Sequence, residues 1–88
     1  MLADMIRGFC ASENYEVYEN YSGRGMFGKL TIGIIVEQDQ NYFEMLYKLT
    51  RYMESKGFYD PLMELEGTAI DDLGLGSIIY FPSIQNYP

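Results

Sequence analysis

Alternating apolar and polar residues predict two strands in the first half of the chain. Residues 14–21 (NYEVYENY) alternate in this way, and the pattern places Tyr15, Val17 and Tyr21 on one face. Residues 30–36 (LTIGIIV) form an apolar run between polar segments, which is typical of a central strand. Because side chains alternate along a strand, one face should hold Leu30, Ile32, Ile34 and Val36, and the other Thr31, Gly33, Ile35 and Glu37. The short glycine-rich segment between the two runs predicts that they form an antiparallel hairpin.

A helical periodicity predicts one long helix in the middle of the chain. Its apolar stripe covers residues 42–56, and Asn41 followed three residues later by a glutamate fits a capping box at its start. Gly57 fits a left-handed residue at its end. Apolar spacing over residues 2–9 predicts a further one or two helical turns that end near Gly8.

The last third of the chain has a less regular pattern. Residues 60–66 fit either a short helix, since an aspartate followed by a proline can start one, or a short edge strand. Residues 69–73 are predicted to form a single helical turn that Thr68 caps. Residues 77–81 (SIIYF) predict a strand that ends at the proline after them.

Together these elements predict an α+β fold. We expect a single domain, residues 1–88, in which a small antiparallel or mixed sheet of three to four strands carries one long helix on one face. The pattern leaves the strand order open, because the last strand can pair with either member of the hairpin.

Composition excludes most kinds of catalytic and metal site. The chain has no histidine, which removes imidazole bases and histidine metal ligands, and a lone Cys10 excludes an intrachain disulfide and a cysteine zinc site. We therefore expect no enzymatic activity, no cofactor and no bound metal. No apolar run reaches the roughly 18 residues of a membrane span. One unpaired cysteine fits a reducing compartment, so we expect a cytoplasmic protein without membrane contact.

The segment GRGMFG, residues 23–28, matches the G-x-G-x-x-G pattern of dinucleotide-binding loops. In those folds a helix follows the loop, whereas a strand is expected here, so the glycines fit a twisted hairpin turn better than a phosphate site. We expect Arg24, Met26 and Phe27 at an exposed loop tip, where they could anchor a protein partner. The alternative is that Phe27 tucks under the sheet.

The chain is strongly acidic, with 13 acidic and 6 basic residues and a net charge of −7. This argues against direct binding of nucleic acid, which requires lysine and arginine. From residue 57 to the end the chain contains acidic residues and no basic ones. If Glu64 and Glu66 lie on a strand, they are about 6.6–7 Å apart on one face. Neighbouring phosphates of a nucleic-acid strand have a similar spacing.

Two acidic groups of residues are therefore candidates for partner binding. The first consists of Glu64, Glu66, Asp71 and Asp72, and the second of Glu16, Glu19 and Tyr18. Either group could occupy a basic groove of a protein through charge complementarity. The alternative is a solvated acidic face that only keeps the protein in solution.

Two blocks of the sequence resemble small proteins of bacteriophages and prophages: YSGRGMFGK (Tyr21–Lys29) and GLGSIIYFP (Gly74–Pro82). The overall profile, a single acidic domain without catalytic side chains, is similar to anti-CRISPR inhibitors. The resemblance implies a phage-encoded inhibitor of a host nucleic-acid machine, and it assigns no functional residue.

On this basis we expect a non-enzymatic inhibitory binding protein in the host cytoplasm. It would dock an acidic surface, as a nucleic-acid mimic, on a basic nucleic-acid-binding face of a host defence complex of the CRISPR-Cas type. One alternative is a self-associating structural or adaptor module, such as a homodimer formed through a bare sheet edge. The other is an enzyme that uses carboxylates and a divalent ion.

Overall fold

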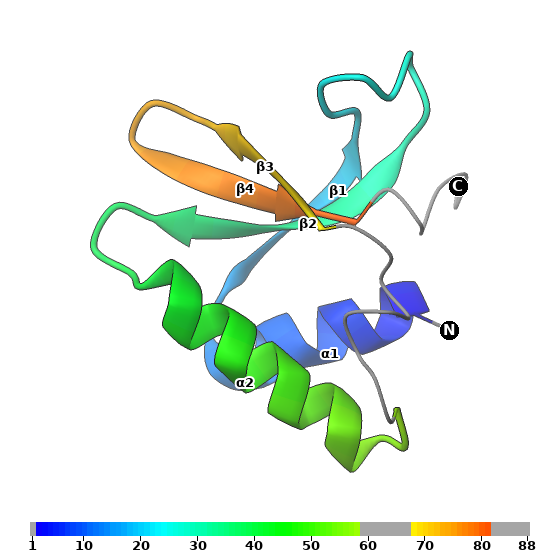
Figure 1. Ribbon diagram of the computed structural model, residues 1–88, viewed down its shortest axis with the longest axis vertical. Helices are drawn as coiled ribbons and strands as arrows, with labels where there is room; N and C mark the ends of the chain where they lie inside the picture. The colour runs from blue at the N-terminus through cyan, green and yellow to red at the C-terminus, as the bar shows by residue number, and fades with distance from the viewer. Residues whose placement is uncertain (1, 59–67, 82–88) are drawn as a thin grey trace.

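The computed structural model describes residues 2–58 and 68–81, and within them the fold is α+β (Figure 1). The elements in chain order are α1 (Leu2–Glu13), β1 (Glu16–Tyr21), β2 (Thr31–Glu37), α2 (Tyr42–Ser55), β3 (Ala69–Asp72) and β4 (Gly76–Tyr80). The strands form one antiparallel sheet in the order β1-β2-β4-β3. The predicted fold class is confirmed, and the last strand lies between β2 and β3. The two predicted alternatives for residues 60–66 lie outside the described residues.

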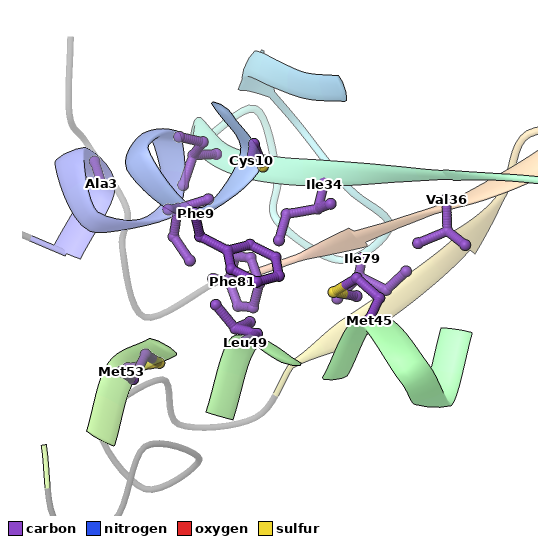
Figure 2. Close-up of a cluster of buried hydrophobic side chains, with 12 residues drawn as sticks. Ala3, Phe9, Cys10, Ile34, Val36, Met45, Leu49, Met53, Ile79 and Phe81 are labelled. Atoms are coloured by element: carbon purple, nitrogen blue, oxygen red, sulfur yellow. The ribbon is translucent and has the colours of Figure 1, made fainter. Parts of the chain in front are cut away.

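Both helices cover the same face of the sheet, and the main core lies between the helices and the sheet (Figure 1). Figure 2 shows Phe9 of α1, Leu49 of α2 and Phe81, the residue after β4, meeting in this core. Ile34 on β2 is completely buried on this face, in line with the predicted alternation of residues 30–36. Burial of this apolar surface is the main stabilising contribution to so small a domain.

Helix α2 begins and ends as its sequence predicts. The Asn41 side chain accepts a hydrogen bond from the backbone N–H of Glu44 at 3.0 Å, which satisfies one of the free donors at the helix start. At the other end Gly57 has φ +99°, and the N–H of Phe58 donates to the carbonyl of Met53 at 3.2 Å. Phe58 then packs against the core.

Helix α1 is longer than predicted, because Gly8 lies inside it rather than at its end. A Cβ atom on Gly8 would be 2.8 Å from the hydroxyl oxygen of Tyr52 on α2, so the glycine allows the two helices to approach closely. The helix ends instead at Glu13, and Asn14 after it has φ +66°. Its apolar stripe therefore continues through Phe9 and Cys10 into the core.

Residues 69–73 are a second correction, since the predicted helical turn is wrong. Ala69–Asp72 forms strand β3 and pairs with β4. The Asp72 carboxylate accepts a hydrogen bond from the N–H of Gly74 at 2.7 Å, and Gly74 has φ +88°. Thr68 and Asp71 suggested the helical turn, but the local side-chain to backbone hydrogen bond comes from Asp72 and stabilises the β3–β4 hairpin turn instead.

Strand β1 contains a bulge that the alternation did not predict. Tyr18 pairs with Gly33, but Tyr21 pairs with Thr31, so β1 carries one extra residue over this interval. Asn20, inside the bulge, has φ +56°. The bulge turns Tyr21 to the face away from the helices, so the prediction that it shares a face with Tyr15 and Val17 is wrong.

Candidate interaction surface

The face of the sheet away from the helices is defined by its pairing. Directly opposed residues point to the same side of a sheet. One row across the four strands consists of Glu16, Ile35, Ile78 and Asp71, and the next of Tyr18, Gly33, Tyr80 and Ala69. The interleaved residues Val17, Ile34 and Ile79 belong to the helix-covered core. We call the side formed by these two rows the uncovered face.

The β1–β2 loop, residues 22–30, folds over one end of the uncovered face. Its Met26 is buried against Ile78 and Tyr80 and forms a second, smaller apolar cluster. A Cβ atom on Gly23 would be 2.3 Å from the ring of Tyr80, so this position accepts only glycine without displacement. Met26 therefore attaches the loop to the sheet, and its predicted place at an exposed tip is wrong.

A carboxylate holds the same loop by hydrogen bonds. The hydroxyl of Tyr21 donates to Asp71 Oδ2 at 2.6 Å, and the backbone N–H of Arg24 donates to the same oxygen at 3.2 Å. The hydroxyl of Tyr80 donates to Asp71 Oδ1 at 3.2 Å. These bonds join β1, the loop, β3 and β4, and we call this group the Asp71 clamp.

Hydrogen bonding and burial shift the titration of the Asp71 clamp. The hydrogen bond from Tyr21 is the largest influence that lowers the pKa of Asp71 below its usual 3.8. Burial, followed by the hydrogen bond to Asp71, raises the pKa of Tyr21 to about 12. Burial and the Asp71 charge also raise the pKa of Tyr80. At neutral pH the clamp therefore holds one charged carboxylate and two neutral phenols.

The tip of the loop is exposed, as predicted for Arg24 and Phe27. Phe27 is 95% exposed and has φ +55°, a conformation that is unfavourable for a residue with a side chain. The alternative that Phe27 tucks under the sheet is wrong. Arg24 and Lys29 are exposed on either side of Phe27 in the chain.

A groove lies at the other end of the uncovered face, between the β2–α2 turn and the β3–β4 hairpin. Its volume is about 530 Å³, and its lining consists of Ile35, Glu37, Gln38, Asp39, Leu73, Leu75 and Gly76. Both leucines are exposed, Leu73 at 44% and Leu75 at 80%. The groove thus combines aliphatic side chains with two exposed carboxylates, Glu37 and Asp39.

The charges of the molecule are separated by layer. The acidic residues of α1 and α2 (Asp4, Glu13, Glu44 and Glu54) are equal in number to the basic residues of these helices and the α2 C-cap (Arg7, Lys48, Arg51 and Lys56). All four of these helical carboxylates form ion pairs with helical cations. The described strands and their connections carry six acidic residues and two basic ones, a net charge of −4.

The structure brings together only part of the predicted acidic groups. Glu16 and Tyr18 lie on the uncovered face, but Glu19 accepts two hydrogen bonds from Arg7 of α1, at 2.8 and 3.1 Å. Asp71 and Asp72 point to opposite faces of β3, because side chains alternate along a strand. Glu64 and Glu66 lie outside the described residues.

The sequence did not indicate Glu37 and Asp39 as candidate residues of the interaction surface. The alternation already placed Glu37 on the same side of its strand as Ile35, but the sequence did not reveal which side the helices leave uncovered. Asp39 lies in the turn before α2, where no periodicity assigns a direction.

Other features of the described chain point to no further chemistry. Among residues 2–58 and 68–81, no three side chains of metal-binding type are close enough to hold an ion, and no helix is long and apolar enough to cross a bilayer. Burial raises the pKa of the Cys10 thiol to about 12, which makes it unreactive.

Comparisons with protein-family models, curated proteins and solved structures find no match.

Proposed function

We propose that this protein is a non-enzymatic inhibitor that docks the acidic side of its sheet on a basic surface of a partner protein. Following the resemblance to phage proteins, the partner is a host defence complex of the CRISPR-Cas type in the cytoplasm, and the surface is one that otherwise binds nucleic acid. The observation that carries the proposal is the charge separation: the helical layer is neutral, and the sheet layer has a net charge of −4.

The arrangement of three carboxylates supports this proposal. Glu16 pairs with Ile35, so Glu37 is its diagonal neighbour on the same face, at about 7–8 Å. Asp39 lies beyond it at the rim of the groove. This spacing is of the order expected for neighbouring phosphates of a nucleic-acid strand, so a partner whose cations bind phosphates would find carboxylates at comparable positions.

These three carboxylates are also available for a partner. Glu16, Glu37 and Asp39 are exposed, and no described residue forms an ion pair with any of them. A partner's lysine or arginine could therefore bind them without displacing an internal cation. Tyr18, exposed beside Glu16 on the same face, adds a rigid aromatic side chain that suits protein recognition.

Charge-matched variants test the proposal. The sheet variant Glu16→Gln/Glu37→Gln/Asp39→Asn and the helix variant Asp4→Asn/Glu13→Gln/Glu54→Gln each remove three negative charges. The wild type and both variants are immobilised, exposed at low salt to lysate of a CRISPR-carrying bacterium, and eluted with rising salt. We expect the wild type and the helix variant to retain the same basic protein, which the sheet variant releases at lower salt.

Three results would contradict the proposal. If the sheet variant retains the protein as strongly as the wild type, the three sheet carboxylates do not contribute to the contact. If both variants lose the protein at the same salt concentration, the location of the charges is irrelevant. If the wild type retains no basic protein at low salt, the acidic side has no such partner in that lysate.

A further inference from the structure

Two features of the surface are not used by the proposed function. The first is the tip of the β1–β2 loop, where Phe27 stands 95% exposed with Arg24 and Lys29 on either side in the chain. The second is the aliphatic part of the groove at the other end of the uncovered face, formed by Ile35, Leu73 and Leu75. A large apolar side chain that is fully exposed, and an apolar groove, each suggest a contact surface.

We propose that these two features bind each other in different copies of the protein: the loop of one molecule places Phe27 in the groove of a second. The two ends are complementary in charge as well as in polarity. Arg24 and Lys29 are the only basic residues of the described strands and connections, and they flank Phe27. The groove carries Glu37 and Asp39 beside its aliphatic wall. A loop with one exposed aromatic side chain and two cations thus meets an apolar groove with two carboxylates.

The loop is held in shape for such a contact. Met26 is buried in the second cluster, and the Asp71 clamp binds the backbone N–H of Arg24. Phe27, which has φ +55°, directly follows the buried Met26, so its unfavourable backbone conformation is maintained by the surrounding loop. Because the loop is already ordered, insertion of Phe27 costs less conformational entropy than ordering a flexible loop.

The loop cannot reach the groove of its own molecule. Strand β2 runs from the loop to the groove, and its seven residues span about 20 Å. Figure 1 shows the β1–β2 loop and the β3–β4 hairpin at separate ends of the sheet. The contact therefore joins the loop end of one copy to the groove end of the next. Such a head-to-tail contact continues into chains or closes into a ring, unlike a symmetric dimer.

We expect the association to be weak and sensitive to salt. The contact is small compared with the roughly 1,200 Å² that stable interfaces bury, so a dissociation constant of about 0.1–1 mM is the expected range. Ion pairs at the rim of the groove are exposed and are screened by added salt.

Complementation between two variants tests the proposal by sedimentation velocity at low salt. The loop variant Phe27→Gly loses the inserted side chain, and glycine suits the positive φ at this position. The groove variant Leu75→Lys adds a positive charge at a residue that is 80% exposed. We expect the wild type to form larger species with rising concentration. Each variant alone should remain a monomer, and an equal mixture should form a one-to-one dimer, because each variant keeps the end that the other lacks.

An exposed aromatic residue elsewhere provides the matched control. Phe43 on α2 is 77% exposed, and Phe43→Ala should associate as the wild type does. The proposal is wrong if the wild type stays monomeric up to about 1 mM at low salt, if either variant associates as strongly as the wild type, or if the mixture of variants remains monomeric. The inference does not rest on the proposed inhibitory function, since this experiment contains no partner protein.

Discussion

Asp71 shows how one residue can lose the role that its charge suggests. The sequence marks it as one of several acidic residues available to a partner, but the structure gives both of its carboxylate oxygens hydrogen bonds from within the molecule. Its charge stabilises the fold by fixing the β1–β2 loop to β3 and β4. The carboxylates that remain for a partner are those without such internal donors, chiefly Glu16, Glu37 and Asp39.

We predict that Asp71→Asn lowers the free energy of unfolding by about 1 kcal/mol at neutral pH, since it weakens charge-assisted hydrogen bonds that solvent partly screens. Because the pKa of Asp71 is lower in the folded protein than its usual 3.8, this contribution is present above that value. It is lost as the pH falls below 3.8 through the folded-state pKa. Urea unfolding of both proteins as a function of pH measures the difference.

The control for this prediction is Asp72→Asn. The amide oxygen of the substituted side chain can still accept the hydrogen bond from the N–H of Gly74, so this variant should keep nearly the wild-type stability. A stability difference between wild type and Asp71→Asn that is the same at pH 7 and at pH 2.5 would show that the charge of Asp71 contributes nothing.

At the level of the elements, the sequence pattern predicted the features that depend on neighbouring residues. The caps of α2 at Asn41 and Gly57 and the alternation of β2 depend on residues within a few positions of each other, and the structure confirms them. The glycine at position 8, which suggested the end of α1, instead makes room for Tyr52 of α2, and this is a contact between distant segments. No periodicity in residues 2–9 contains that information.

The sheet shows the same division. The β1 bulge moves Tyr21 to the uncovered face, and its reason becomes visible only with Tyr80 and Asp71, which come from the end of the chain. The candidate surface, too, was predicted only in part. Glu16, Tyr18, Arg24 and Phe27 are exposed as expected, but the helices decide which side of the sheet is available, and the helix-covered face could not be derived from alternation alone.

We predict that Gly23→Ala destabilises the protein by about 1–3 kcal/mol, because the added methyl group would collide with the ring of Tyr80. The loop should also separate from β4, which near-ultraviolet circular dichroism of the tyrosines would report. Ser22→Ala, at the exposed neighbouring position, should change stability by less than about 0.5 kcal/mol. Equal unfolding midpoints for the two variants would show that the loop does not pack on Tyr80 as described.

At the scale of the whole molecule, the helical layer and the sheet layer differ in charge and in what they expose. The helical layer covers the core, and its four carboxylates all form ion pairs with helical cations. The sheet layer keeps an unneutralised acidic face with a basic aromatic loop at one end and a groove at the other. Since a basic partner and the loop of a second copy would both bind Glu37 and Asp39, the two proposed contacts exclude each other. If both proposals hold, the form that binds the partner is therefore the dissociated one.

The most direct test of the central claim, that the sheet carboxylates form the contact, is chemical labelling of carboxylates with and without the captured partner, read by mass spectrometry. We predict that Glu16, Glu37 and Asp39 react in the free protein and become protected in the complex, whereas Asp4, Glu13 and Glu54 on the helices react equally in both. Protection of the helical carboxylates, with unchanged labelling of the sheet carboxylates, would contradict the account.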